Sequence, residues 1–224
     1  MQAWEKVFAA LTHRLEAYET RPGQREMAAA VARVLAEGGH LLVEAGTGTG
    51  KSFAYLIPLL CHAALSGEKV VVSTATIALQ EQILRKDLPL LQELLPARLE
   101  AVLVKGKGHY LCRWRLEREQ QATLFPEEGW HELCAWARET TTGDGAEVEG
   151  TVPAALWARV AADETCHRPF CPYQEDCFFL VARERAARAA VLVVNHHLYL
   201  SDLRVRLAGG GDTGVLPEHR VAVF

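Results

Sequence analysis

The segment from residue 40 to residue 52 constrains the fold of this chain more than any other stretch. It begins with an apolar run of a length typical of a buried strand, and we expect a strand over 41–44. Three glycines then alternate with threonines up to Gly50, and Lys51 and Ser52 open an apolar stretch of helical character. A strand, a glycine-rich turn and a helix start in this order are typical of a phosphate-binding loop.

The residue types in this loop suit the binding of phosphate. Glycine lets successive backbone N–H groups point at phosphate oxygens, because no Cβ stands in the way. Lys51 is expected to reach the β- and γ-phosphates and the Ser52 hydroxyl to bind Mg²⁺, so both are assigned catalytic roles. The usual pattern starts with glycine, where this chain has the small residue Ala45. The loop residues expected to bind nucleotide are Gly46, Thr47, Gly48, Thr49, Gly50, Lys51 and Ser52.

Strands and helices alternate along the chain. Buried-strand signatures lie at 41–44, 70–74, 101–104 and 191–194, and a further strand begins at 221. Helical patterns cover 3–16, 22–37, 50–65, 77–95 and 177–190. Such alternation is typical of βαβ units, so the sequence predicts an α/β fold with a parallel sheet and helices on both faces. Pro89 is expected to interrupt the fourth helix.

The middle of the chain departs from this pattern. From about residue 106 the sequence is mixed and rich in charged and aromatic residues, and it includes an expected exposed loop at 140–145. The strand signature returns only at residue 191. We therefore expect a P-loop domain that begins in 1–105, a mainly helical insertion over 106–190, and a return to the P-loop domain in 191–224.

Four of the six cysteines form a set associated with the insertion: Cys112, Cys166, Cys171 and Cys177. Short segments between the last three let the backbone wrap a metal cluster, and the aromatic residues among them would shield it from water. The pattern predicts an iron–sulphur cluster. The alternatives are zinc, which more often uses C-x2-C pairs that this chain lacks, and unrelated buried thiols. Cys61 and Cys134 have the apolar, helical context of core residues.

A basic and aromatic stretch surrounds the first of these cysteines. Lys105, Lys107 and Arg113 are suited to neutralise phosphates, and Tyr110 and Trp114 to stack on unpaired bases. We therefore predict nucleic-acid contacts from these residues. The alternative is a solvated charged surface.

A second group of candidate nucleic-acid contacts follows the strand at 70–74. The hydroxyls of Thr74 and Thr76 and the amide of Gln80 lie where parallel strands end, which is the edge at which ligands of open α/β sheets bind. Alternatively, Thr76 caps the helix that follows it. Asn195 is expected to cap the helix after the strand at 191–194 in the same way.

Composition excludes some classes of protein. No run of 18 apolar residues occurs, and the first twenty residues lack the apolar centre of a signal peptide, so we expect no membrane association and a cytoplasmic location. The net charge of −4 means that any nucleic-acid surface must be local.

These motifs together resemble the iron–sulphur superfamily 2 DNA helicases of the DinG/XPD type, and most closely their DinG-like branch. The matching segments are 21–24, 44–52, 73–76 with 79–80, the four cysteines in their order, and 194–196. The resemblance implies a RecA-like motor with a 4Fe-4S domain inserted after the third strand, and it implies that Gln24 reads adenine. It further implies a monomeric enzyme that binds single-stranded or forked DNA and uses ATP and Mg²⁺ to unwind DNA in the 5′→3′ direction during repair or replication.

One departure from the family qualifies this expectation. In the family a strand like 221–224 leads into the acidic Walker B residues that hold Mg²⁺, and a second domain supplies an arginine. The chain stops before them, so we expect the N-terminal part of a longer helicase that binds nucleotide weakly and does not hydrolyse it alone. The alternatives are a non-catalytic DNA-binding or redox-sensing module with the cluster, and a P-loop kinase or similar small-molecule enzyme.

Overall fold

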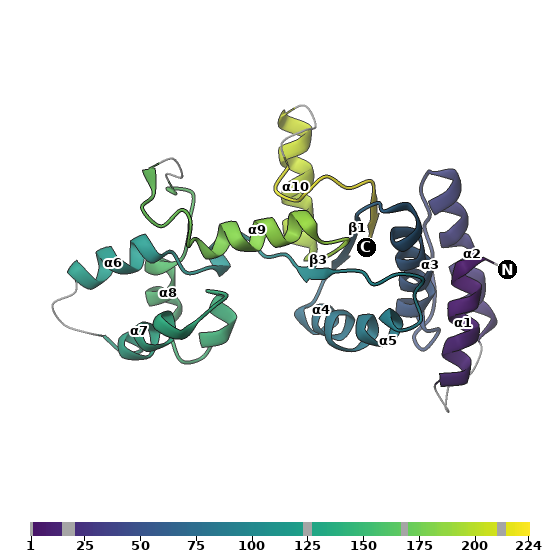
Figure 1. The fold of residues 1–224 in the computed structure, drawn as a ribbon, viewed down its shortest axis with the longest axis horizontal. Coiled ribbons are helices and arrows are strands. Elements are labelled where there is room, and N and C mark those ends of the chain that lie inside the picture. The colour runs from purple at the N-terminus through teal and green to yellow at the C-terminus, as the bar shows by residue number, and fades with distance from the viewer. Residues whose placement is uncertain (1, 15–20, 123–126, 167–169, 210–213) are drawn as a thin grey trace. The chain divides into compact units, whose positions relative to one another are not determined.

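The computed structural model describes residues 2–14, 21–122, 127–166, 170–209 and 214–224 (Figure 1). The chain divides into two compact units. Unit 1 consists of Met1–Leu103 and Arg188–Phe224, and unit 2 consists of Val104–Ala187. Among the described residues, no helix has the length and apolarity that a membrane crossing requires.

Unit 1 is built from helices and a parallel sheet. Its helices are α1 (Ala3–Arg14), α2 (Pro22–Glu37), α3 (Lys51–Ser66), α4 (Ile77–Gln82), α5 (Leu88–Gln92) and α10 (His196–Gly209). Its strands are β1 (Val70–Thr74), β2 (Ala101–Leu103), β3 (Val191–Asn195) and β4 (Val221–Val223). The strand order is β2-β3-β1-β4, and every pair is parallel. The predicted fold class, α/β with a parallel sheet and helices, is confirmed.

Valine-rich strands form the centre of this sheet. All of β1 is buried, and so are the first four residues of β3. Val70 and Val72 pack in one cluster with Val191 and Val193 and with side chains of α1 and α3. Val71 lies between them and is also fully buried, because successive residues of a strand point to opposite faces. A sheet covered on both faces explains why β1 and β3 are continuous apolar runs.

The strand expected over 41–44 is absent, and this prediction was wrong. These residues have no regular structure, and the side chain of Leu42 is 98% exposed. An apolar run forms a strand only where a neighbouring strand supplies hydrogen-bond partners. The described sheet contains no strand that pairs with these residues.

The helix expected over 77–95 is interrupted earlier than predicted. A π-helical turn over Ile83–Asp87 separates α4 from α5. Pro89 lies in the first turn of α5, where a missing N–H costs no hydrogen bond. The proline therefore starts a helix here, and the π-helical turn makes the break.

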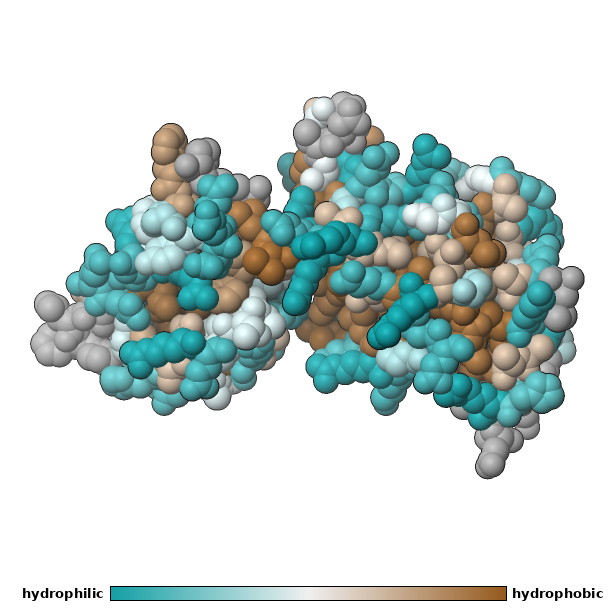
Figure 2. All heavy atoms as spheres, in the orientation of Figure 1, coloured by the Kyte–Doolittle hydropathy of each residue, from teal (hydrophilic) through white to brown (hydrophobic). Residues whose placement is uncertain are grey.

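Unit 2 is mainly helical and has its own core. Its helices are α6 (Arg113–Ala122), α7 (Trp130–Glu139), α8 (Ala154–Val160) and α9 (Phe178–Arg188), the last of which ends in unit 1. Leu133, Leu156 and Val160 are almost fully buried at its centre. The loop over 140–145 is only partly exposed, because Gly143 is buried against the ring of Phe178. Both units also carry hydrophobic side chains at the surface, among hydrophilic ones (Figure 2).

Candidate nucleotide and cysteine sites

The glycine-rich loop turns through two glycines in the left-handed region. Gly48 and Gly50 both have φ of +81°. The left-handed backbone favours glycine at residue 50, and a Cβ there would lie 2.2 Å from Nε2 of Gln24 and displace that side chain. The Gln24 amide donates to the Gly50 carbonyl at 2.9 Å. The structure therefore brings Gln24 to the loop, although 26 residues separate it from Gly50.

Two cationic side chains also meet the loop. The Lys51 ammonium donates to the carbonyls of Ala45 and Gly46, at 2.9 Å each. The Arg21 guanidinium donates to the Gly48 carbonyl. Both positive groups therefore lie at the surface to which phosphate would bind. Sequence reasoning assigned no role to Arg21, and its only signal was its place in the Arg21–Gln24 segment before the loop.

Ser52 lies in the first turn of α3 and has a buried neighbour. Its hydroxyl is hydrogen-bonded to Tyr55, one turn along the helix. Burial, with a further contribution from the charge of Asp87, raises the pKa of Tyr55 to about 12, against the effect of the Ser52 hydrogen bond. Tyr55 is therefore neutral at physiological pH, and the Ser52 oxygen keeps lone-pair capacity for a cation.

The second group of candidate nucleic-acid residues is divided between surface and interior. Thr76 is exposed, whereas Thr74 is 2% exposed and Gln80 is 6% exposed. The Thr76 hydroxyl accepts from the Leu79 N–H at 3.2 Å, so the predicted cap of α4 is confirmed. Asn195 accepts from the Leu198 N–H at 2.7 Å and likewise caps α10. The structure thus presents the Thr76 hydroxyl to solvent and holds the other two side chains inside.

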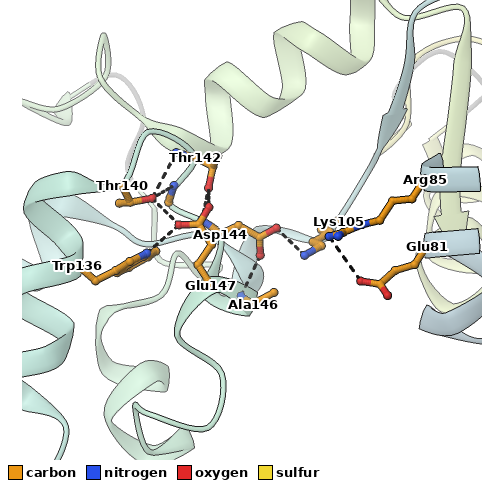
Figure 3. A network of polar contacts seen from close by, with 10 residues as sticks. Glu81, Arg85, Lys105, Trp136, Thr140, Thr142, Asp144, Ala146 and Glu147 are labelled. Carbon is orange, nitrogen blue, oxygen red and sulfur yellow. Dashed lines mark hydrogen bonds and ion pairs between the residues drawn. The ribbon is translucent and has the colours of Figure 1, made fainter. Parts of the chain in front are cut away.

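The two lysines of the basic stretch have acidic partners in unit 2. Lys105 lies 2.5 Å from the carboxylate of Asp144 (Figure 3), and Lys107 lies 2.9 Å from that of Glu164. Tyr110 is 7% exposed, and burial, with a contribution from Asp144, raises its pKa to about 12. These contacts bind the stretch to the fold of unit 2.

Arg113 and Trp114 open helix α6 and are partly buried. The Arg113 Nε donates to the Asp176 carbonyl at 3.3 Å, and its guanidinium lies 4.4 Å from the centre of the Phe178 ring. The guanidinium of Arg118 lies over the Trp114 ring, at 5.1 Å. Both residues therefore keep part of their surface accessible while they contact neighbouring side chains.

The four cysteines of the predicted set line two adjoining cavities of unit 2. A cavity of about 360 Å³ is bordered by Cys112, Cys166 and Cys171, together with the rings of Trp114 and Phe170. A smaller cavity of about 60 Å³ shares these thiols and adds Cys177. In the part of the chain that is described, no three histidine, cysteine, aspartate or glutamate side chains are grouped so that they could hold a metal ion. The residues present are soft thiol donors with aromatic walls, a donor chemistry that suits an iron–sulphur cluster or zinc.

The Cys112 sulphur lies at the start of a helix. The residue immediately precedes α6, and its sulphur accepts hydrogen bonds from the N–H groups of Arg115 and Trp114. Burial raises the pKa of the Cys112 thiol, and these two hydrogen bonds partly offset the effect. N–H groups at a helix start stabilise negative charge on sulphur. By contrast, Cys61 lies in the core of unit 1, where burial raises its pKa to about 11.

These observations define a P-loop α/β domain with a cysteine-bearing helical unit between two of its strands. The DEAD/DEAH box helicase family matches residues 21–126. The chain belongs to the DinG-like helicases of this class and corresponds to an N-terminal portion of them.

Three relatives illustrate the match. The chain is 37% identical to the ATP-dependent DNA helicase YoaA of Escherichia coli over 96% of its own length. It is 39% identical to the ATP-dependent helicase DinG of Mycobacterium tuberculosis over 91%, and 36% identical to the 3'-5' exonuclease DinG of Bacillus subtilis over 86%. The matches cover 34%, 33% and 21% of these proteins, so the chain spans about a third or less of their length.

Proposed function

We propose that this chain is the ATP-binding part of a DNA helicase motor that binds single-stranded or forked DNA and unwinds DNA in the 5′→3′ direction during repair or replication. The observation that carries the proposal is the loop over 46–52, with the side chains of Gln24 and Lys51 directed to its backbone at 2.9 Å. The motor acts as a monomer in the cytoplasm. Its substrate follows from its place among the DinG-like helicases.

Each residue at the loop has a distinct task. The backbone of residues 46–50 surrounds the phosphates, and Lys51 exchanges its two carbonyl partners for β- and γ-phosphate oxygens. Ser52 binds Mg²⁺ through its hydroxyl. Gln24 reads the adenine edge, and its present bond to Gly50 couples that reading to the shape of the loop.

The four cysteines Cys112, Cys166, Cys171 and Cys177 are proposed to hold a 4Fe-4S cluster. Such a cluster supplies four-point cross-linking and a redox-active centre when it is bound. The chain contributes the four thiols, the cavity walls and the hydrogen bonds to the Cys112 sulphur.

The proposed nucleic-acid contacts come from both units. Thr76, Lys107, Arg113 and Trp114 have accessible or partly accessible side chains here and are the first contacts proposed. The others, Thr74, Gln80, Lys105 and Tyr110, have less exposed side chains and contribute after local rearrangement.

Replacement of Lys51 tests the nucleotide site. Lys51→Ala should weaken the binding of a fluorescent ATP analogue with Mg²⁺ by at least about 10-fold, because a hydrogen bond to a charged group contributes roughly 1.5–3 kcal/mol. Titration by fluorescence anisotropy measures this. Lys6→Ala, which removes an exposed lysine of α1, is the control and should bind like the parent. Equal affinity of the Lys51 variant and the parent would refute the proposed site.

A further inference from the structure

Helix α6 contacts every segment that carries a cysteine of the proposed cluster. Cys112 immediately precedes the helix, and residues 113, 115 and 117 each reach a different downstream segment. Two of these three residues, Arg113 and Arg115, lie in the basic stretch around Cys112.

Arg115 holds the segment that ends at Cys166. Its guanidinium donates to the Arg159 carbonyl at 2.8 Å and to the Ala158 carbonyl at 3.2 Å, and it forms an ion pair with Asp163. The other carboxylate oxygen of Asp163 accepts from the N–H of Thr165 at 2.9 Å and from its hydroxyl at 2.6 Å. A continuous set of bonds therefore runs from α6 to the residue before Cys166.

The same helix holds the segments of Cys171 and Cys177. Glu117 accepts from the Tyr173 hydroxyl at 2.9 Å, and Tyr173 follows Cys171 by two positions. Arg113 donates to the carbonyl of Asp176 and lies against the ring of Phe178, so it contacts both neighbours of Cys177.

Backbone pairing supports the first of these attachments. The Cys112 N–H donates to the Val160 carbonyl at 2.8 Å, and the Ala162 N–H donates to the Tyr110 carbonyl at 2.9 Å. The segments that lead into Cys112 and towards Cys166 are thus already joined by their backbones. The side chains of α6 extend this order to the remaining cysteines.

We propose that Arg113, Arg115 and Glu117 are positioning residues that hold the four cysteine-bearing segments close to one another before any cluster is bound. The inference rests on the proposed function, because it takes an iron–sulphur cluster as the ligand. A site ordered in advance binds its ligand faster and more tightly, since less chain entropy is lost on binding. The proposal gives Arg113 and Arg115 a structural role, the positioning of cysteine-bearing segments, which the positive charge of the residues around Cys112 does not indicate by itself.

Reconstitution of the metal-free chain tests this role. Anaerobic addition of ferrous iron and sulphide should load the parent, measured as iron and sulphide per chain and as growth of visible absorbance. Arg115→Lys keeps the charge but loses the planar fork, and it should load roughly 10-fold more slowly. Tyr173→Phe removes one hydrogen bond and nothing else, so it remains informative where Arg115→Lys fails to fold. Arg138→Ala removes an exposed arginine of α7, elsewhere in unit 2, as the matched control.

Hydrogen exchange of the metal-free chain gives a readout independent of the cluster. The Thr165 amide should be protected in the parent and in Arg138→Ala, and it should lose protection in Arg115→Lys. If every variant loads iron and protects Thr165 as Arg138→Ala does, the inference is overturned and the cluster assignment stays intact. A parent that takes up neither iron nor sulphide would instead overturn the cluster assignment, and the inference with it.

Discussion

Glu147 shows how one exposed carboxylate organises part of unit 2. Its Oε2 accepts from the Trp136 indole at 2.7 Å and from the Thr140 hydroxyl at 2.9 Å, while Oε1 accepts from Thr142 (Figure 3). Burial acts to raise the pKa of Glu147, but the hydrogen bonds from Thr142, Trp136 and Thr140 outweigh it and bring the pKa below its ordinary value of 4.5. The carboxylate thus fastens α7 to the loop that follows it.

Acid should weaken unit 2 through this residue. A carboxyl whose pKa is lower in the folded state stabilises the fold above its ordinary pKa, and that contribution is lost as the pH falls through the folded value. We expect the urea concentration at which unit 2 is half unfolded to decrease as the pH is lowered below about 4.5. The decrease should be smaller in Glu147→Gln. Tryptophan fluorescence at a series of pH values measures this. Glu149→Gln, an exposed neighbour, should behave like the parent, and identical pH profiles for both variants would contradict the prediction.

For single residues, the sequence shows which side chains are chemically suited to bind phosphate. It does not show which of them form ion pairs with other side chains in the folded protein. Lys51 could be assigned to the loop because a motif carries the spacing, whereas the role of Gln24 was implied only by the family resemblance. The acids that pair with Lys105 and Lys107 lie 39 and 57 residues further along the chain. No local pattern reveals such partners, because they meet only once unit 2 has folded.

Among the elements, the turn at Gly143 is the most tightly constrained. Gly143 has φ of +63°, and a Cβ there would lie 2.3 Å from the Phe178 ring. The turn brings the loop after α7 against the first residue of α9. Two separate requirements therefore select glycine, namely the left-handed backbone and the lack of space.

Gly143→Ala should destabilise unit 2 by at least about 2 kcal/mol, because overpacking adds to backbone strain. Gly150→Ala separates the two effects, since Gly150 has φ of +88° but nothing within 4 Å of the added Cβ. It should cost only the strain, about 1–2 kcal/mol. Urea unfolding measures both variants, and equal losses would show that the contact with Phe178 does not matter.

Elements could be predicted where the local signal is sufficient. Helix α3 and strands β1 and β3 follow from continuous patterns and lie close to their expected bounds. The strand expected over 41–44 has an equally apolar sequence, but a strand also needs a partner that the run itself does not encode. The π-helical turn at 83–87 has no sequence signal comparable to that of Pro89, so the break was assigned to the wrong residues.

On the scale of the whole molecule, each unit has a separate hydrophobic cluster. The cluster of unit 1 gathers around α3 and the sheet, and that of unit 2 around Leu133 and Leu156. The two clusters have no member in common. Stability should accordingly be a property of each unit rather than of the chain.

Leu133→Ala should therefore destabilise unit 2 alone, by about 2–5 kcal/mol from lost burial and the cavity left behind. Leu60→Ala, a fully buried residue of α3, is the reciprocal control for unit 1. Hydrogen exchange resolved by peptide in increasing urea measures the two units separately. Loss of protection in both units from either substitution would show that they unfold together.

The position of β3 in the sheet has a consequence for the order of events on the ribosome. β3 lies between β2 and β1 and pairs with both, yet it follows them only after the whole of unit 2. At synthesis rates of about 5–20 residues per second, β2 waits roughly 5 to 18 s for the strand that joins the two, and β1 waits roughly 6 to 24 s. Unit 2 emerges complete within that interval. Nascent unit 1 therefore exposes two unpaired strands during translation until β3 emerges and pairs with both.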